Sequence, residues 1–131
     1  MLNKIELFRM AGAMTEHSSE RHQMIARNIA NADTPGYQAR DLVSFSDTYE
    51  RSDTGGAALR STRSGHMDFV GGGVGAEYGT YLTHEDSNPN GNTVSLETEM
   101  MRSTENRFQH DMALSIYKTS LGILRSSLGR R

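Results

Sequence analysis

The stretch DSNPNGNTVSLE, residues 86 to 97, has the residue types and spacing of a calcium-binding loop. Oxygen-bearing side chains alternate at Asp86, Asn88 and Asn90, Gly91 occupies the sixth position, and Glu97 stands at the twelfth. A proline lies among the ligand positions, however, the eighth position is not aliphatic, and the residues before the loop would make a poor entering helix. The same residues also suit a polar turn that leads into a helix, so both interpretations stay open.

Other patterns that suggest chemistry have weaker support. Gly71, Gly73 and Ala76 satisfy a degenerate dinucleotide-binding pattern, but no strand–turn–helix unit surrounds them. His17 and His22 are five residues apart and therefore do not share a helical face. The chain has no cysteine, which excludes thiolate metal sites and disulfides. The sequence therefore predicts no enzyme active site, no metal site of this kind and no cofactor.

A long first helix is predicted from residue 3 to residue 31. Leu7, Met10, Met14 and Met24 recur at helical spacing, no proline interrupts the segment, and Gly12 is its only glycine. The middle of the segment, TEHSSERHQ, is polar on all sides. A helix of this length would measure about 42 Å, which is too long and too thinly apolar for the core of a small globular domain.

The segment ANADTPGY, residues 30 to 37, ends this helix abruptly. Pro35 has no N–H to continue the helix, and it disfavours helical backbone at the residue before it. Pro35–Gly36 suits the central pair of a type II turn, because glycine tolerates the positive φ at the second position. The Tyr37 ring can then fold back on the helix end. The candidate turn site comprises Ala30, Asn31, Thr34, Pro35, Gly36 and Tyr37.

A second long helix is predicted from residue 94 to residue 128. Ser95 is a suitable N-cap, and Glu97 and Glu99 lie in the first turn, where the helix dipole favours carboxylates. Apolar residues follow at spacings of three, four and seven, close to those of a coiled-coil seam. The candidate assembly seam comprises Met101, Phe108, Met112, Leu114, Tyr117, Leu121, Leu124 and Leu128.

The middle segment, residues 32 to 93, has little to bury. Residues 38 to 92 contain nine of the 13 glycines, and residues 66 to 85 alternate enough to suggest a weak hairpin. LVSFSDTYE, residues 42 to 50, is compatible with a short strand or a helical turn. The expected fold is mostly α, a single domain of residues 1–131. Its long terminal helices pack as a coiled-coil-like pair beside a glycine-rich, loop and weak-β middle.

Composition limits the classes of function. Leu, Ile, Val and Phe make up 23 of 131 residues, about 18%, which is slightly below the share typical of chains with a good core. We therefore expect a marginal monomer that gains stability by association. A net charge of −2 and a pI of 6.2 argue against a nucleic-acid footprint. The sequence offers neither a membrane-spanning apolar run nor a cleavable signal peptide, so composition alone favours the cytosol.

The helix-ending segment carries a resemblance that changes this interpretation. ANADTPGY resembles the motif Ala-Asn-x-x-Thr-Pro-Gly-Tyr near the end of the first helix of flagellar axial proteins. YQARDLVSF after it and NGNTVSLETEM before the last helix are similar to the flagellar basal-body rod protein family. The resemblance is strongest at residues 24 to 45 and 90 to 125 and weak in the glycine-rich middle.

The resemblance implies a non-catalytic structural subunit of the bacterial flagellar rod. It implies that the terminal helices form the inner layer of a tube and that the turn directs the middle segment outward. The implied partners are other rod subunits, the adaptor FliE, the membrane-ring protein and the flagellar export apparatus. Its implied location is the periplasm-spanning rod of the basal body, reached by export without a cleavable signal peptide.

Two other classes of function remain open. One is a calcium-binding module built on residues 86–97. The other is a helical adaptor or export chaperone that binds a partner without polymerising.

Overall fold

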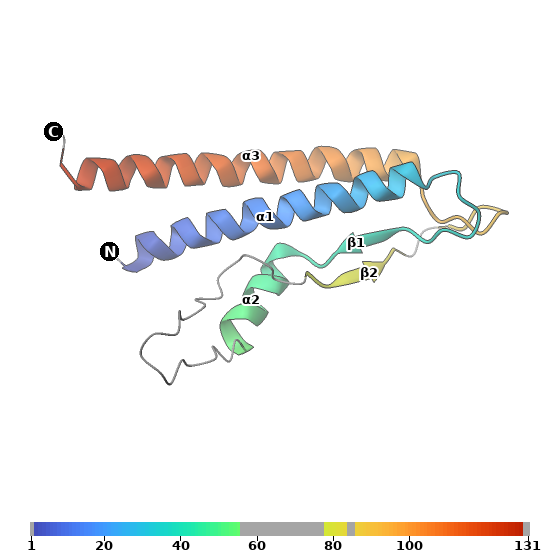
Figure 1. The fold of residues 1–131 in the computed structure, drawn as a ribbon, viewed down its shortest axis with the longest axis horizontal. Helices are drawn as coiled ribbons and strands as arrows, with labels where there is room; N and C mark the ends of the chain where they lie inside the picture. The colour runs from blue at the N-terminus through green and yellow to red at the C-terminus, as the bar shows by residue number, and fades with distance from the viewer. Residues whose placement is uncertain (1, 56–77, 84–85, 130–131) are drawn as a thin grey trace, which may run out of the picture.

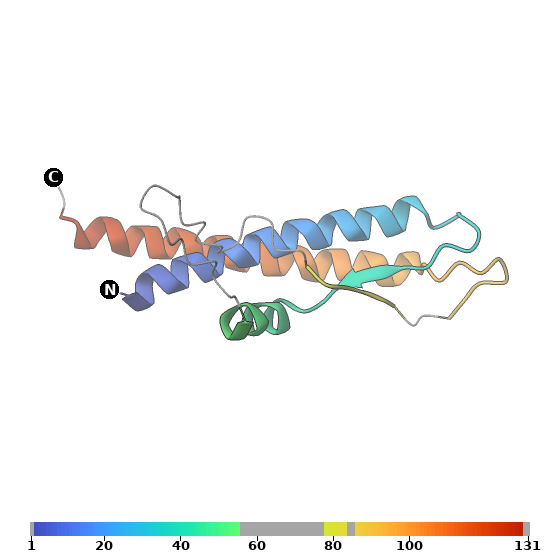
Figure 2. The same cartoon turned by 60° about the horizontal axis from the view of Figure 1, so that its bottom comes forward.

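The computed structural model describes residues 2–55, 78–83 and 86–129, and it is mostly helical (Figure 1). Two long helices, α1 (Leu2–Ala30) and α3 (Leu96–Ser127), lie side by side over most of their lengths (Figures 1 and 2). Their ends fall within two residues of the predicted bounds. The predicted fold class, a pair of long terminal helices with a weak sheet between them in sequence, is confirmed.

The start of α3 follows from its local sequence. Ser95 has extended backbone angles, and its side chain accepts a hydrogen bond from the N–H of Thr98 at 3.4 Å. Glu97 and Glu99 occupy the first turn, and Arg125 the last. These charges complement the helix dipole, and the predicted N-cap is confirmed.

The face along which the two helices pack is unusually polar. The buried residues of α3 are Glu99, Asn106, Ala113 and Ser120, which are spaced seven apart. On α1, the buried residues Ala11, Ser18 and Ile25 have the same spacing. A period of seven keeps one side of a helix facing its neighbour, as in a coiled coil. The packing is therefore coiled-coil-like in geometry, although few of its residues are large and apolar.

In its described residues, the middle segment has more regular structure than expected, and its strands and helix lie on one side of the helix pair (Figure 1). Strand β1 (Arg40–Leu42) pairs in antiparallel fashion with β2 (Thr80–Leu82). Helix α2 (Phe45–Gly55) follows β1, and Ser44 caps it by accepting a hydrogen bond from the N–H of Asp47 at 3.3 Å. Within residues 42–50, where a short strand or a helical turn was expected, Leu42 ends β1 and residues 45–50 begin the 11-residue helix α2. The helix starts there because Ser44 and Asp47 supply start signals.

The hairpin expected within residues 66–85 lies largely outside the described residues. Its described part contains β2, whose partner is the distant β1. In Figure 1, β1 lies between α1 and β2.

Candidate functional site

The turn after α1 has the predicted geometry. Tyr37 N–H donates to the Thr34 carbonyl at 3.3 Å, which closes a four-residue turn around Pro35 and Gly36. Gly36 has a φ of +72°, the positive value that a type II turn requires at this position. Asn31 stabilises the exit from the helix, because its Nδ2 donates to the Arg27 carbonyl at 2.8 Å.

Asn92, in the segment just before α3, hydrogen-bonds to this turn. Its side chain is fully buried and donates from Nδ2 to the carbonyls of Asn31 at 2.9 Å and of Ala32 and Thr34 at 2.8 Å. Its Oδ1 accepts from the N–H of Val94 at 2.7 Å. These three carbonyls belong to the turn that follows α1. Asn92 therefore ties the turn that ends one long helix to the segment that starts the other.

Two glycines allow the segments to approach this closely. Gly36 N–H donates to the Asn90 carbonyl at 3.0 Å. Gly91 has a φ of +79°, and a Cβ built on it would lie 3.4 Å from the Gly36 Cα. Any other residue at Gly91 would be strained by its backbone angle, and its Cβ would touch the opposing chain. We call the unit formed by residues 31–37 and 90–94 the clasp.

Asn28 connects the clasp to the middle segment. It is buried, and its Nδ2 donates to the Arg40 carbonyl at 2.7 Å. Its Oδ1 accepts from the Tyr37 hydroxyl at 3.2 Å and from the N–H of Arg40 at 3.3 Å. The expectation that Tyr37 folds back on the helix end is thus confirmed. One amide fixes α1, the turn and β1 relative to one another.

An ionic network fastens β1 to both long helices. Arg21 of α1 forms a bidentate pair with the buried Asp41, with bonds of 3.0 and 2.8 Å. The hydrogen bond to Asp41 raises the pKa of Arg21 above its ordinary value and outweighs burial, which lowers it. Arg102 of α3 pairs with Glu99 at 2.7 Å and lies 3.8 Å from Asp41. The cationic and anionic side chains of this network are paired with one another. The network therefore positions β1 and does not present a reactive side chain.

The loop with calcium-like spacing forms half of the clasp. Asn90 Oδ1 accepts from the N–H of Asn92 at 3.1 Å, and Gly91 N–H donates to the Asn88 carbonyl at 2.8 Å. Glu97 lies in the first turn of α3. The part of the chain that the structure describes contains no group of three or more His, Cys, Asp or Glu residues able to hold a metal ion. The geometry of this loop instead explains how it binds the turn after α1.

The residues of the predicted assembly seam do not lie on a single face. Phe108, Met101 and Met112 have exposures of 70%, 69% and 41%, on the side of α3 turned away from α1. The second half of the set is half-buried at Leu114, Tyr117, Leu121 and Leu124, and Leu128 at the end is exposed. Tyr117 contacts α1, since its ring centroid lies 4.4 Å from that of Phe8. The stripe therefore divides into an outer part and a part that borders α1.

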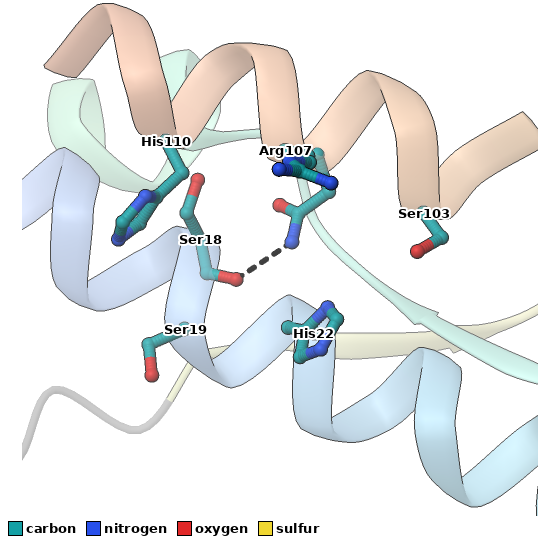
Figure 3. Close-up of a pocket in the computed structure, with 7 residues that line it drawn as sticks. Ser18, Ser19, His22, Ser103, Arg107 and His110 are labelled. Carbon is teal, nitrogen blue, oxygen red and sulfur yellow. Dashed lines mark hydrogen bonds between the residues drawn. The ribbon is translucent and has the colours of Figure 1, made fainter.

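A polar cleft of about 350 Å³ lies between the two helices (Figure 3). Ser18, Ser19 and His22 of α1 lie across from Ser103, Arg107 and His110 of α3. Asn106 crosses the seam there and donates from Nδ2 to the Ser18 carbonyl at 2.8 Å. Its buried Oδ1 has no hydrogen-bond partner among the residues that the structure describes. The cleft thus leaves part of the helix interface incompletely packed.

Comparison with known proteins gives a consistent result. The family model described as "Flagella basal body rod protein" matches residues 17–38, the end of α1 and the turn of the clasp. The chain is 34% identical to the flagellar basal body rod protein FlgB of Salmonella typhimurium over 108 residues, which cover 79% of this chain and 78% of that protein. The chain belongs to the FlgB family.

The similarity extends over nearly the whole chain in other members. FlgB of Proteus mirabilis is 31% identical over 134 residues, which cover 95% of this chain and 98% of that protein. FlgB of Escherichia coli is 33% identical over 102 residues, or 74% of each chain. Among the described residues, no helix has the length and apolar character needed to cross a membrane.

Sequence reasoning located only half of the clasp. It singled out Asn31, Thr34 and Gly36, but it treated the segment before α3 as a turn or a calcium loop and did not identify Asn28 or Asn92. The available signal was the run of asparagines around a glycine, NPNGN, immediately before a helix N-cap. Asparagine in such a run is a frequent cap, although its partner lies 58 to 61 residues away in sequence.

Proposed function

We propose that the chain is a structural subunit of the bacterial flagellar rod that assembles through its long terminal helices and transmits torque. The observation that carries the proposal is the apolar outer face of α3, formed by Met101, Phe108 and Met112, which no described part of the chain covers. Contiguous exposed apolar surface on a protein usually marks an interaction site. Family membership supports a structural role and not a catalytic one.

The clasp supports the same proposal, because it sets how the two long helices are joined. Asn92 and the Gly36–Gly91 contact bring the end of α1 next to the start of α3. From the turn, β1 then runs back along one side of the pair (Figure 1). The described residues thus leave the outer face of α3 uncovered, where a neighbouring subunit can pack.

The partners that we propose are other rod subunits, the adaptor FliE, the membrane-ring protein and the export apparatus. The names of the relatives refer to the flagellar basal body rod, and we place this chain in the same structure. The proposal needs no cofactor and no nucleic acid.

The proposal is tested with Phe108→Glu in flagellated cells that lack their own copy of the gene. A carboxylate on the outer face would have to be desolvated when another helix packs against it. We expect loss of swimming and of complete rods in purified basal bodies, while the free chain keeps its helical circular dichroism.

Lys118→Glu is the matched control, because Lys118 is exposed on the same helix and, ten residues from Phe108, does not share its face. It should leave swimming unchanged. Normal rods with Phe108→Glu, or equal loss with both variants, would show that the outer face of α3 is not the assembly surface.

A further inference from the structure

β1 and β2 form a two-stranded ribbon in which every second residue of each strand hydrogen-bonds to the other strand. Val43 N–H donates to the Gly79 carbonyl at 2.8 Å, and Thr83 N–H donates to the carbonyl of residue 39 at 3.0 Å. In an antiparallel pair with this register, the residues between these positions direct their backbone groups to the other side. The N–H and C=O groups of Thr80 and Leu82 therefore point away from β1.

The outer edge of β1 is closed by side chains. Asn28 of α1 donates to the Arg40 carbonyl and accepts from the Arg40 N–H, much as a neighbouring strand would. Asp41 Oδ1 accepts from the N–H of Leu42 at 2.8 Å. β1 thus has partners on both sides, since it lies between α1 and β2 (Figure 1).

In the part of the chain that the structure describes, no side chain closes the outer edge of β2 in this way. Among the described residues, nothing hydrogen-bonds the outward backbone groups of Thr80 and Leu82. Tyr81 and Leu82 have exposures of 50% and 40%. Residues 78–83, YGTYLT, contain no charge and no proline, the features with which proteins usually protect a free edge. An unprotected edge of this kind is a template for another strand.

The edge is complementary to a second copy of itself. If two β2 strands pair in antiparallel fashion about Tyr81, Thr80 of each copy lies opposite Leu82 of the other. Both residues carry the outward backbone groups, so each exchanges its N–H and C=O with its opposite residue. The two Tyr81 rings then face each other at a non-hydrogen-bonded position, where side chains are closest. No like charges meet along the strand.

We propose that the free chain forms a symmetric dimer in which β2 pairs with β2 of a second copy. A two-fold contact closes after two copies, whereas a rod needs contacts that continue. The β2 contact is therefore separate from the outer face of α3, and it does not rest on the proposed function.

The absence of native cysteines allows a direct test with Tyr81→Cys in the full-length chain. A non-hydrogen-bonded pair has a Cα–Cα distance of about 4.5 Å, within the range that a disulfide spans. In dilute solution with a mild oxidant, we expect disulfide dimers to form roughly tenfold faster than with Thr104→Cys, because strand pairing raises the effective thiol concentration. Thr104 is exposed on α3, far from β2 in sequence.

A second substitution tests whether the backbone edge is responsible. Leu82→Pro in the Tyr81→Cys chain removes an outward N–H without removing a donor within the ribbon. It should lower the rate of disulfide dimer formation to that of Thr104→Cys. Thr80→Pro should have the same effect, whereas Leu82→Val, which keeps the N–H, should not. The proposal is overturned if Tyr81→Cys reacts no faster than Thr104→Cys, or if neither proline slows it in chains whose circular dichroism is unchanged.

Discussion

The two faces of α3 differ in an unusual way: most of its buried side chains are polar, and several of its large apolar side chains are exposed. Of the residues that α3 buries, Glu99, Asn106, Ala113 and Ser120, only Ala113 is apolar, and larger apolar residues such as Tyr117 lie half-buried beside α1. The outer face exposes Met101 and Phe108 by about two thirds of their surface. In a self-sufficient domain, burial of apolar surface supplies most of the favourable free energy of folding. Here several of the largest apolar side chains of α3 lie outside the chain's own interface.

This difference shows how structural roles are divided along one helix. The inner face determines geometry through small residues, one hydrogen bond across the seam and the period of seven. The outer face carries apolar surface whose burial requires a neighbour. We therefore expect the free chain to be marginally stable and to gain stability when a neighbour covers this face. Substitutions on the two faces should therefore change different quantities.

The largest effect on the free chain is expected from Ala113→Glu on the inner face. Ala113 is fully buried, so a longer, charged side chain would be overpacked and desolvated against α1. We expect a loss of about 3 kcal/mol or more in the free energy of unfolding, measured by urea denaturation. Ser115→Glu, at an exposed position on the same helix, should change it little. Similar values for both variants would mean that the inner face does not hold the pair together.

A somewhat smaller loss is expected from Asn92→Ala in the clasp. The substitution removes the donor to three carbonyls of the turn after α1 and leaves polar groups unpaired, at a cost of about 2–3 kcal/mol. Asn88→Ala, at an exposed position in the same loop, is the control for loop composition. If Asn92→Ala is as stable as Asn88→Ala, polar contacts at this end do not contribute to joining the helices.

The sequence predicted the elements better than the contacts between them. The long helices, the Ser95 cap and the turn at Pro35–Gly36 depend on local rules of propensity and capping, and all were predicted. The inner face was missed because hydrophobic periodicity searches for apolar residues, whereas its period of seven is carried by Glu99, Asn106, Ala113 and Ser120. Polar residues that recur every seven positions look the same in sequence whether that face of the helix is exposed or buried.

The contacts of the middle segment were missed for a different reason. Asn92 and Asp41 act on partners far away in sequence, and no local pattern specifies which carbonyl or guanidinium an amide or carboxylate will meet. The pairing of β1 with β2 likewise joins two three-residue segments, which are too short for a clear alternation. The resemblance to rod proteins identified the motif but not the bonds that it forms.

A gain in stability is expected from Asn106→Leu, which sharpens the contrast between the faces. The asparagine donates one hydrogen bond to the Ser18 carbonyl, but its buried Oδ1 has no partner in the described part of the chain. Leucine removes that unsatisfied acceptor and adds apolar contact beside the polar cleft, so we expect about 1 kcal/mol of stabilisation in urea. Asn106→Asp should have the opposite effect, because it buries a charge. Destabilisation by Asn106→Leu would show that the hydrogen bond to Ser18, and not the shape of the seam, maintains the pair.

The smallest change is expected from Met101→Gln on the outer face. Met101 is 69% exposed, so glutamine of similar length replaces a side chain that is already in water. The free energy of unfolding of the free chain should stay within about 0.5 kcal/mol of the unsubstituted value. The comparison between the faces depends on this near-zero result, since it requires that the outer apolar residues contribute nothing until a neighbour covers them. A loss above about 1 kcal/mol in dilute chain would mean that Met101 is buried in the free chain, and the outer face would then belong to its own core.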